Sequence, residues 1–218
     1  MTISSGQTGH SVSPVANLPV VVGITGASGA ALARATVDLL LDRGTPVIAS
    51  ASSASRIVWN QELEESFGAT LERWDGTGLF TFHPAGRIDA PIASGSVPTH
   101  GMAVVPCSMA TLAAIAHGFA DNLIRRAADV CLKERRPLVL VPRETPVSPI
   151  HLENMLKLGR LGVTILPPEP PFYLKPRTVD EIVDHIAHRV IGALGLAESL
   201  PPEMRYQAPN ADTSNGAG

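Results

Sequence analysis

The feature that most constrains the fold of this chain is a repeated alternation between short apolar segments and longer amphipathic ones. The first apolar segment, Pro19 to Thr25, leads through the turn Gly26-Ala27-Ser28-Gly29 into Ala30 to Arg43, whose apolar residues recur with helical spacing. This succession predicts a buried strand, a tight glycine turn and a helix. Glycines in such a turn let the backbone change direction sharply and approach a ligand closely.

The alternation continues to residue 194. Further strands are predicted over residues 47–50, 102–106, 137–141 and 163–166, and further helices over residues 55–68, 108–116, 122–135, 150–161 and 178–194. Thr178 is expected to cap the last helix, with Glu181 completing a capping box. Strands separated by helices form right-handed βαβ units. We therefore predict a three-layer, Rossmann-like (flavodoxin-like) α/β fold, a parallel sheet with helices on both faces.

One folded domain is predicted, over residues 19–198. The chain has 218 residues, of which 44% are hydrophobic and 17% are charged, and this is enough for one large core. Residues 1–18 are rich in Ser, Gly and Thr without periodicity and are expected to form a flexible arm. Residues 199–218 are expected to form a flexible tail.

Composition disfavours several classes of function. A net charge of -3 with scattered Lys and Arg gives no broad basic face, so no nucleic-acid partner is expected. The sequence has no long apolar run and no recognisable signal peptide, so no membrane contact is expected either. Two cysteines fit a reducing compartment, and we place the protein in the cytoplasm. His185 and His188 lie three residues apart on a helix, but we expect no metal site there.

Two charged residues follow the strand predicted at residues 137–141. Pro142 is expected to end that strand, because proline lacks the N–H that a central strand needs. Arg143 and Glu144 are then placed at a carboxyl end, where open α/β sheets bind their ligands. A solvated loop would explain the two charges as well, but Gly- and Ser-rich loops at other strand ends favour a binding site.

The turn after the first strand is suited to a phosphate group. Its free N–H groups lie at the positive end of the following helix. It lacks the Gly-x-Gly-x-x-Gly fingerprint of dinucleotide sites, and Ser50 and Ser52, not an acidic residue, stand at the end of the second strand. NAD is therefore disfavoured and a mononucleotide fits better. The alternative is a tight turn that binds no ligand.

A second polar loop, Cys107-Ser108-Met109-Ala110-Thr111, follows the strand predicted at residues 102–106 and opens a helix. Its hydroxyl and N–H groups can form another phosphate cradle, although helix capping alone explains Ser108. We interpret Cys107 as a small buried side chain, because no base is recognisable near it in the sequence.

Seven motifs between residues 19 and 195 resemble those of the UbiX/Pad flavin prenyltransferases, a family formerly described as aromatic-acid decarboxylases. They are Gly23-Ile24-Thr25-Gly26-Ala27-Ser28-Gly29, Pro106-Cys107-Ser108, Asp121-Asn122-Leu123, Arg126-Ala127-Ala128-Asp129-Val130, Leu132-Lys133-Glu134-Arg135-Arg136, Pro142-Arg143-Glu144-Thr145-Pro146 and Ile150-His151-Leu152-Glu153-Asn154-Met155. The resemblance implies a metal-independent enzyme that joins a dimethylallyl group from dimethylallyl phosphate to N5 and C6 of reduced FMN. It also implies that a UbiD-type decarboxylase receives the product, and that the enzyme is a homo-oligomer, a dodecamer built from trimers with active sites at subunit contacts.

The resemblance also assigns roles to individual residues. The positions that match FMN contacts are Gly26, Ala27, Ser28, Ser52, Ser108, Met109, Ala110, Thr111 and Arg143. The positions around dimethylallyl phosphate are Lys133, Tyr173 and Arg189, with Arg126 and Glu62 as weaker candidates. Hydrogen-bond donors of this kind stabilise the charge that a leaving phosphate gains, and they would replace a metal. Glu144 completes the predicted catalytic set, in which it handles protons.

Two other kinds of function remain open. A flavin-dependent decarboxylase of the cysteine type shares the flavin fold, but it would not need the phosphate-binding set Lys133, Tyr173 and Arg189. A non-catalytic FMN carrier, or a subunit of a decarboxylase, would need no charged catalytic groups. For Lys133 and Arg189, a solvated helix face is the alternative explanation.

Overall fold

Six parallel strands form one sheet in the computed structural model, which describes residues 17–197 and 200–206. The strands are β1 (Val20–Ile24), β2 (Val47–Ala51), β3 (Phe80–Phe82), β4 (Gly101–Cys107), β5 (Leu138–Pro142) and β6 (Thr164–Ile165). The α-helices are α1 (Ala30–Asp42), α2 (Ser53–Glu62), α3 (Phe67–Asp75), α4 (Met109–Ala116), α5 (Leu123–Lys133), α6 (Pro149–Arg160) and α7 (Val179–Ala193). Short 3₁₀ helices are η1 (Pro91–Ala93), η2 (Phe172–Leu174) and η3 (Pro202–Met204).

The strand order is β3-β2-β1-β4-β5-β6, and every neighbouring pair is parallel. The chain therefore winds outward in one direction from β1 and in the other direction from β4. This order places a crevice beyond the carboxyl ends of β1 and β4, at the switch point where doubly wound folds bind ligands. We call the edge where the strands end the carboxyl edge and the opposite one the amino edge. The predicted fold class is confirmed.

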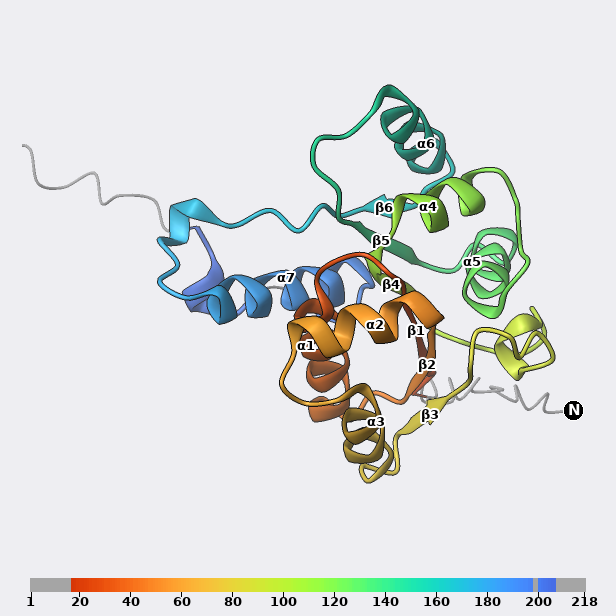
Figure 1. The fold of residues 1–218 in the computed structure, drawn as a ribbon, viewed down its shortest axis with the longest axis horizontal. Helices are drawn as coiled ribbons and strands as arrows, with labels where there is room; N and C mark the ends of the chain where they lie inside the picture. Colours follow the sequence, from red (N-terminus) through yellow and green to blue (C-terminus); the bar gives the residue numbers. More distant parts are fainter. Residues whose placement is uncertain (1–16, 198–199, 207–218) are drawn as a thin grey trace, which may run out of the picture.

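Both faces of the sheet are covered by helices (Figure 1). Side chains alternate along β1, so that Val20, Val22 and Ile24 join a buried cluster with residues of α1 and α7. Val21 points the other way and joins a second cluster with residues of α4, α5 and α6. Two separate cores on either side of one sheet are what a three-layer fold requires. Among the described residues, no helix is both long and apolar enough to cross a bilayer.

Several predicted elements differ from the observed ones in detail. The single helix predicted over residues 55–68 is wrong, because Ser66 accepts a hydrogen bond from the N–H of Ala69 and starts the separate helix α3. Strand β3 is not predicted at all. Pro142 is the last residue of β5, not the first residue after it, and it pairs with Cys107 beyond an irregularity in the β4–β5 register.

The capping box expected at α7 is only half formed. Thr178 Oγ1 accepts from the N–H of Glu181, but the Glu181 carboxylate accepts from the N–H of Arg177 and not from that of Thr178. A complete capping box lies instead at α6, between Ser148 and His151.

The predicted arm and tail lie mostly outside the described residues. Within the predicted arm, Asn17 Nδ2 donates a hydrogen bond to the carbonyl of Gly44 at 2.7 Å. Within the predicted tail, η3 is followed by Tyr206, whose ring packs edge-on against that of Tyr173. The domain limits themselves remain a prediction.

Candidate active site

The loops after β1 and β4 are tied together at the crevice. Thr25 Oγ1 donates a hydrogen bond to the carbonyl of Pro106 at 2.8 Å and accepts one from the N–H of Ser108 at 2.7 Å. Thr25 is buried. It is not among the predicted site residues, although a hydroxyl residue between a strand and a glycine turn could have indicated its linking role. These hydrogen bonds link the two predicted phosphate loops to each other.

Three helices begin at this edge of the sheet. Helix α1 starts after Gly29, α2 is capped by Ser52, and α4 is capped by Ser108. The side chain of Ser108 accepts from the N–H of Thr111. The N–H groups of Met109 and Ala110 lie in the first turn of α4, where the helix itself supplies no acceptor. Free N–H groups and positive helix ends suit an anion, so this donor set fits the phosphate of FMN.

Small residues shape the turn after β1. Gly29 has a φ of 119°, a backbone conformation that residues with a side chain rarely adopt. Gly26 faces the start of α2, where an added Cβ would overlap the Cβ of Ala54. Ala27 is buried and Ser28 is half-buried. The turn is therefore packed tightly against α2.

Glu62 is the last residue of α2, and its carboxylate binds the first N–H groups of α1. Its Oε2 accepts hydrogen bonds from the N–H of Gly29 at 2.9 Å and of Ala30 at 2.7 Å, and its side chain also bonds to Ser28. Partial desolvation raises the pKa of Glu62, but these hydrogen bonds and the charge of Arg143 outweigh it and hold the pKa below its ordinary value. A charged carboxylate thus fixes the Ser28 turn.

Arg143 joins the end of β5 to both loops. Its Nε donates to the carbonyl of Ser28 at 3.3 Å, and its main-chain N–H donates to the carbonyl of Cys107 at 3.3 Å. The next residue, Glu144, accepts a hydrogen bond at Oε1 from the N–H of Thr145. Both side chains are exposed, yet Arg143 is held at the crevice and is not a free loop residue.

A cleft of about 470 Å³ adjoins these two charges. Its walls are mostly apolar and come from α4, α6 and the segment after β6. The lining residues are Met109, Pro142, Arg143, Glu144, Thr145, Val147, Leu152, Met155, Pro167, Pro168 and Glu169. An apolar cleft of this size with a few charged groups at one end is typical of a cofactor or substrate site.

Lys133 does not lie in this site. It is the last residue of α5, and the chain then enters β5 at Leu138, so Lys133 lies toward the amino edge while Arg143 lies at the carboxyl edge. The length of β5 alone separates the two edges by roughly 16 Å. Lys133 Nζ pairs with Glu134 in this structure. Arg126, earlier on α5, pairs with Asp129.

Tyr173 and Arg189 also lie apart from Lys133 within one chain. Tyr173 is 53% exposed and packs against Tyr206. Arg189 lines a separate cleft of about 520 Å³ with Arg43, which follows the far end of α1. Figure 1 shows η2, in cyan, on the opposite side of the molecule from α5. The predicted phosphate-binding set therefore does not converge in a single copy of the chain.

The two cysteines are buried. Burial raises the pKa of the Cys107 thiol to about 12 and that of Cys131 to about 11. The interpretation of Cys107 as a small buried side chain is confirmed, and its thiol does not face the crevice as a nucleophile.

Known proteins resemble this chain in sequence and in fold. A family model described as Flavoprotein matches residues 10–191. The flavin prenyltransferase UbiX of Halalkalibacterium halodurans is 44% identical over 190 residues, covering 82% of this chain and 89% of that protein. A dodecameric FMN-dependent UbiX-like decarboxylase from Escherichia coli O157:H7 has a TM-score of 0.81 and 44% identity, covering 88% of this chain and 100% of the other. AnUbiX, solved with FMN and dimethylallyl pyrophosphate, has a TM-score of 0.78 and 40% identity, covering 82% of this chain and 93% of the other.

The fold, the crevice and the family model together define a flavoprotein. Within that class, the chain belongs to the UbiX-type flavin prenyltransferase family.

Proposed function

We propose that the protein is a flavin prenyltransferase that joins the dimethylallyl group of dimethylallyl phosphate to N5 and C6 of reduced FMN. The observation that carries the proposal is the gathering of Ser28, Ser108 and Arg143 at one crevice, in a chain that shares 44% identity with a named flavin prenyltransferase. The relative solved with FMN and dimethylallyl pyrophosphate supports both ligand classes.

Reduced FMN supplies the nucleophilic atoms of the reaction when it is bound. Ser52, Ser108 and Thr111 offer hydroxyl groups at the starts of α2 and α4, and Met109 and Ala110 offer main-chain N–H groups. These donors hold the phosphate and ribityl chain. The turn Gly26-Ala27-Ser28 and Arg143 complete the cofactor site beside the flavin.

Lys133, Tyr173 and Arg189 serve the substrate phosphate in a site shared between copies of the chain. All three are exposed, and Lys133 lies at the other end of β5 from Glu144 in its own copy. Phe172, beside Tyr173, is 78% exposed, which is costly for an apolar side chain that stays in water. An oligomer can bring these surfaces to the crevice of a neighbour, and one solved relative is dodecameric. We therefore expect a homo-oligomer, a dodecamer built from trimers.

The charged groups divide the chemistry between them. As the C–O bond of dimethylallyl phosphate breaks and the bond to N5 forms, Lys133, Arg189 and Tyr173 donate hydrogen bonds to the departing phosphate. Arg126 adds a positive charge on the same helix as Lys133. When the second bond closes, the prenyl double bond gains a proton, which the released phosphate would bring from N5, and C6 loses a proton, which Glu144 would accept. Glu62 acts through Ser28, because its carboxylate would repel a phosphate.

The mass of the flavin tests the proposal. Anaerobic incubation of the protein with FMN, dithionite and dimethylallyl phosphate should add C5H8 to the flavin. A decarboxylase of the cysteine type or an FMN carrier would leave the flavin mass unchanged, and a mass gain only with the diphosphate would correct the substrate. Because protein cations balance the leaving charge, EDTA should not lower the yield.

The later fate of the product is also part of the proposal. A UbiD-type decarboxylase is the expected recipient, and it should gain activity when its cofactor-free form is mixed with the reaction. A cytoplasmic location is inferred from the sequence alone, since two unpaired cysteines fit a reducing compartment.

A further inference from the structure

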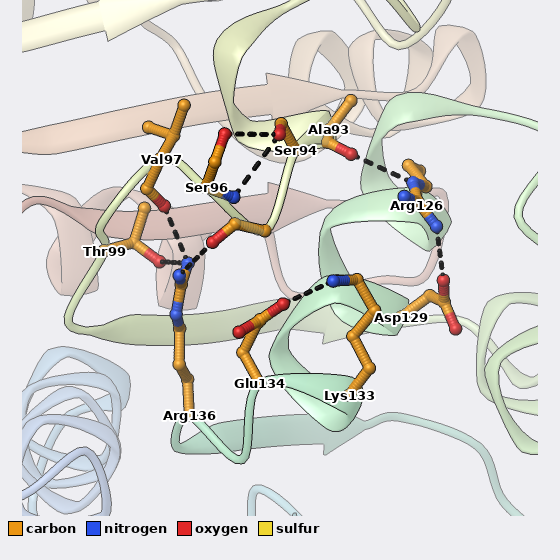
Figure 2. A network of polar contacts seen from close by, with 11 residues as sticks. Ala93, Ser94, Ser96, Val97, Thr99, Arg126, Asp129, Lys133, Glu134 and Arg136 are labelled. Carbon is orange, nitrogen blue, oxygen red and sulfur yellow. Dashed lines mark hydrogen bonds and ion pairs between the residues drawn. The ribbon is translucent and has the colours of Figure 1, made fainter.

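The segment before β4 is fastened to the chain that follows α5 (Figure 2). Arg136 donates from Nη2 to the carbonyl of Gly95 at 2.7 Å, and from Nη1 to the carbonyl of Val97 and to Thr99 Oγ1, both at 2.9 Å. One guanidinium group thus holds three points of residues 93–99, which we call the amino-edge loop. A planar fork with five donors is suited to such a clamp.

The amino-edge loop is fixed at its other end too. Arg126 Nε donates to the carbonyl of Ala93 at 3.0 Å. Ile92, directly before the loop, is 2% exposed and belongs to the core beneath α5. The hydroxyl groups of Ser94 and Ser96 are exposed and lie 2.8 Å apart. The loop is therefore held in place from both sides while its tip faces solvent.

Gly95, at the tip of this loop, lies against the charged end of Lys133. A Cβ built on Gly95 would overlap Lys133 Nζ and Glu134 Oε1, which pair with each other. Both overlapped atoms are the far ends of flexible side chains, so an alanine would displace the ammonium group and leave the backbone in place. The absence of a side chain at Gly95 thus sets where the ammonium of Lys133 can lie.

We propose that Arg136 and Gly95 are positioning residues for Lys133, which they hold ready for the phosphate of the substrate. The inference rests on the proposed function, in which Lys133 binds that phosphate. Arg136 fixes the amino-edge loop, and the loop at Gly95 limits the positions open to the Lys133 ammonium. A side chain that is already ordered loses less conformational freedom when it binds a ligand. Within one copy of the chain, the hydrogen bonds of Arg136 go to the amino-edge loop and not to the FMN loops, so we expect both residues to act on substrate binding.

Gly95→Ala is the sharper test, because it should leave the fold intact. The measured quantity is the dissociation constant of dimethylallyl phosphate, by calorimetry on the assembled protein loaded with oxidised FMN, which is not alkylated. We expect the affinity to fall about tenfold, as when one charge-assisted hydrogen bond is weakened. FMN content and melting temperature should match the wild type. Wild-type affinity in Gly95→Ala would overturn the proposal.

Arg136→Gln tests the clamp through a double-mutant cycle with Lys133→Ala. If Arg136 acts through Lys133, its substitution should weaken substrate binding alone but add little in the Lys133→Ala background. Arg135→Asn is the matched control, because it removes the adjacent guanidinium and asparagine tolerates the left-handed backbone at φ 55°. Additive losses in the double variant would show a merely structural role and overturn the proposal.

The two levels of inference fail in different ways. Unchanged affinity in Lys133→Ala itself would refute the proposed function of Lys133, whatever Arg136 does. A loss in Lys133→Ala without one in Gly95→Ala would refute only the positioning roles.

Discussion

Arg143 Nε donates a hydrogen bond at 3.3 Å to the main-chain carbonyl of Ser28, 115 positions earlier in the sequence. The contact joins the end of β5 to the turn after β1. The turn that is predicted to bind phosphate and the Arg143 side chain that is predicted to lie beside the flavin are therefore neighbours. Neither sequence pattern alone indicates this contact. The charge of Arg143 also helps to keep Glu62 ionised beside Ser28.

Ser28→Asp should reduce FMN binding. The new carboxylate would stand at the start of α1 next to Glu62 and would repel the phosphate of the cofactor. We expect the FMN content of the purified protein, measured by absorbance, to fall at least about tenfold, equivalent to roughly 1.4 kcal/mol. Ser66→Asp is the control, since it adds the same charge at the start of α3 and keeps a good helix cap. Unchanged flavin content in Ser28→Asp would remove Ser28 from the cofactor site.

Glu144→Gln should separate binding from chemistry. Glutamine keeps the size of the side chain but cannot accept the proton released from C6. FMN and dimethylallyl phosphate should still bind, while the single-turnover rate of prenylation falls by about 10²-fold. Glu153→Gln, an exposed carboxylate on α6, serves as the control. A wild-type rate in Glu144→Gln would leave the released phosphate itself as the base.

The carboxylate of Glu62 should make stability depend on pH. Its folded pKa lies below the ordinary value of 4.5, so its contribution is fully present above that pH and is lost as the pH falls through the lowered pKa. Glu62→Gln should therefore lower the free energy of unfolding near neutral pH, by on the order of 0.5–1 kcal/mol for a charge at a helix start. The difference from wild type should shrink in acid.

Urea unfolding of the flavin-free protein at several pH values measures this difference. Glu64→Gln controls for the loss of one nearby negative charge. A difference between wild type and Glu62→Gln that grows as the pH falls would contradict the assigned interaction.

Much of the sheet could be predicted from the sequence, because its strands are buried on both sides and appear as apolar runs between helices. Strand β3 escaped detection because Phe80–Phe82 is only three residues long, too short to show alternation. The helix predicted over residues 55–68 covers α2 and the start of α3. The apolar pattern continues across the junction, and a single serine, Ser66, marks the start of the new helix. Pro142 could remain in β5 because it is the last residue of the strand.

The arrangement of the candidate site is less predictable than its residue types. Glycine and serine after two strands place both loops at one edge of the sheet, since parallel strands end at one edge; phosphate binding there stays a prediction. The separation of Lys133 from Glu144 follows from strand direction, because one residue precedes β5 and the other follows it. The contact of Arg136 with the amino-edge loop joins residues about forty positions apart, and no local pattern encodes it.

The buried cysteines should resist alkylation. Burial raises the pKa of both thiols, so little thiolate forms near neutral pH. Iodoacetamide should add nothing to the intact protein and should label Cys107 and Cys131 after unfolding, as measured by mass spectrometry. Rapid labelling of Cys107 in the native state would reopen a nucleophilic role.

The central claim is that each prenyltransferase active site is built from more than one copy of the chain. Mixed oligomers test this claim most directly. Lys133→Ala and Glu144→Gln are each expected to be nearly inactive, but an oligomer that contains both holds some sites with an intact Lys133 and an intact Glu144. Mixed oligomers of Glu144→Gln and Arg143→Ala are the control, because these two residues are adjacent in one chain. The account predicts that the first mixture adds C5H8 to reduced FMN and that the control mixture does not. A first mixture as inactive as its parents, with both chains present in each oligomer, would contradict it.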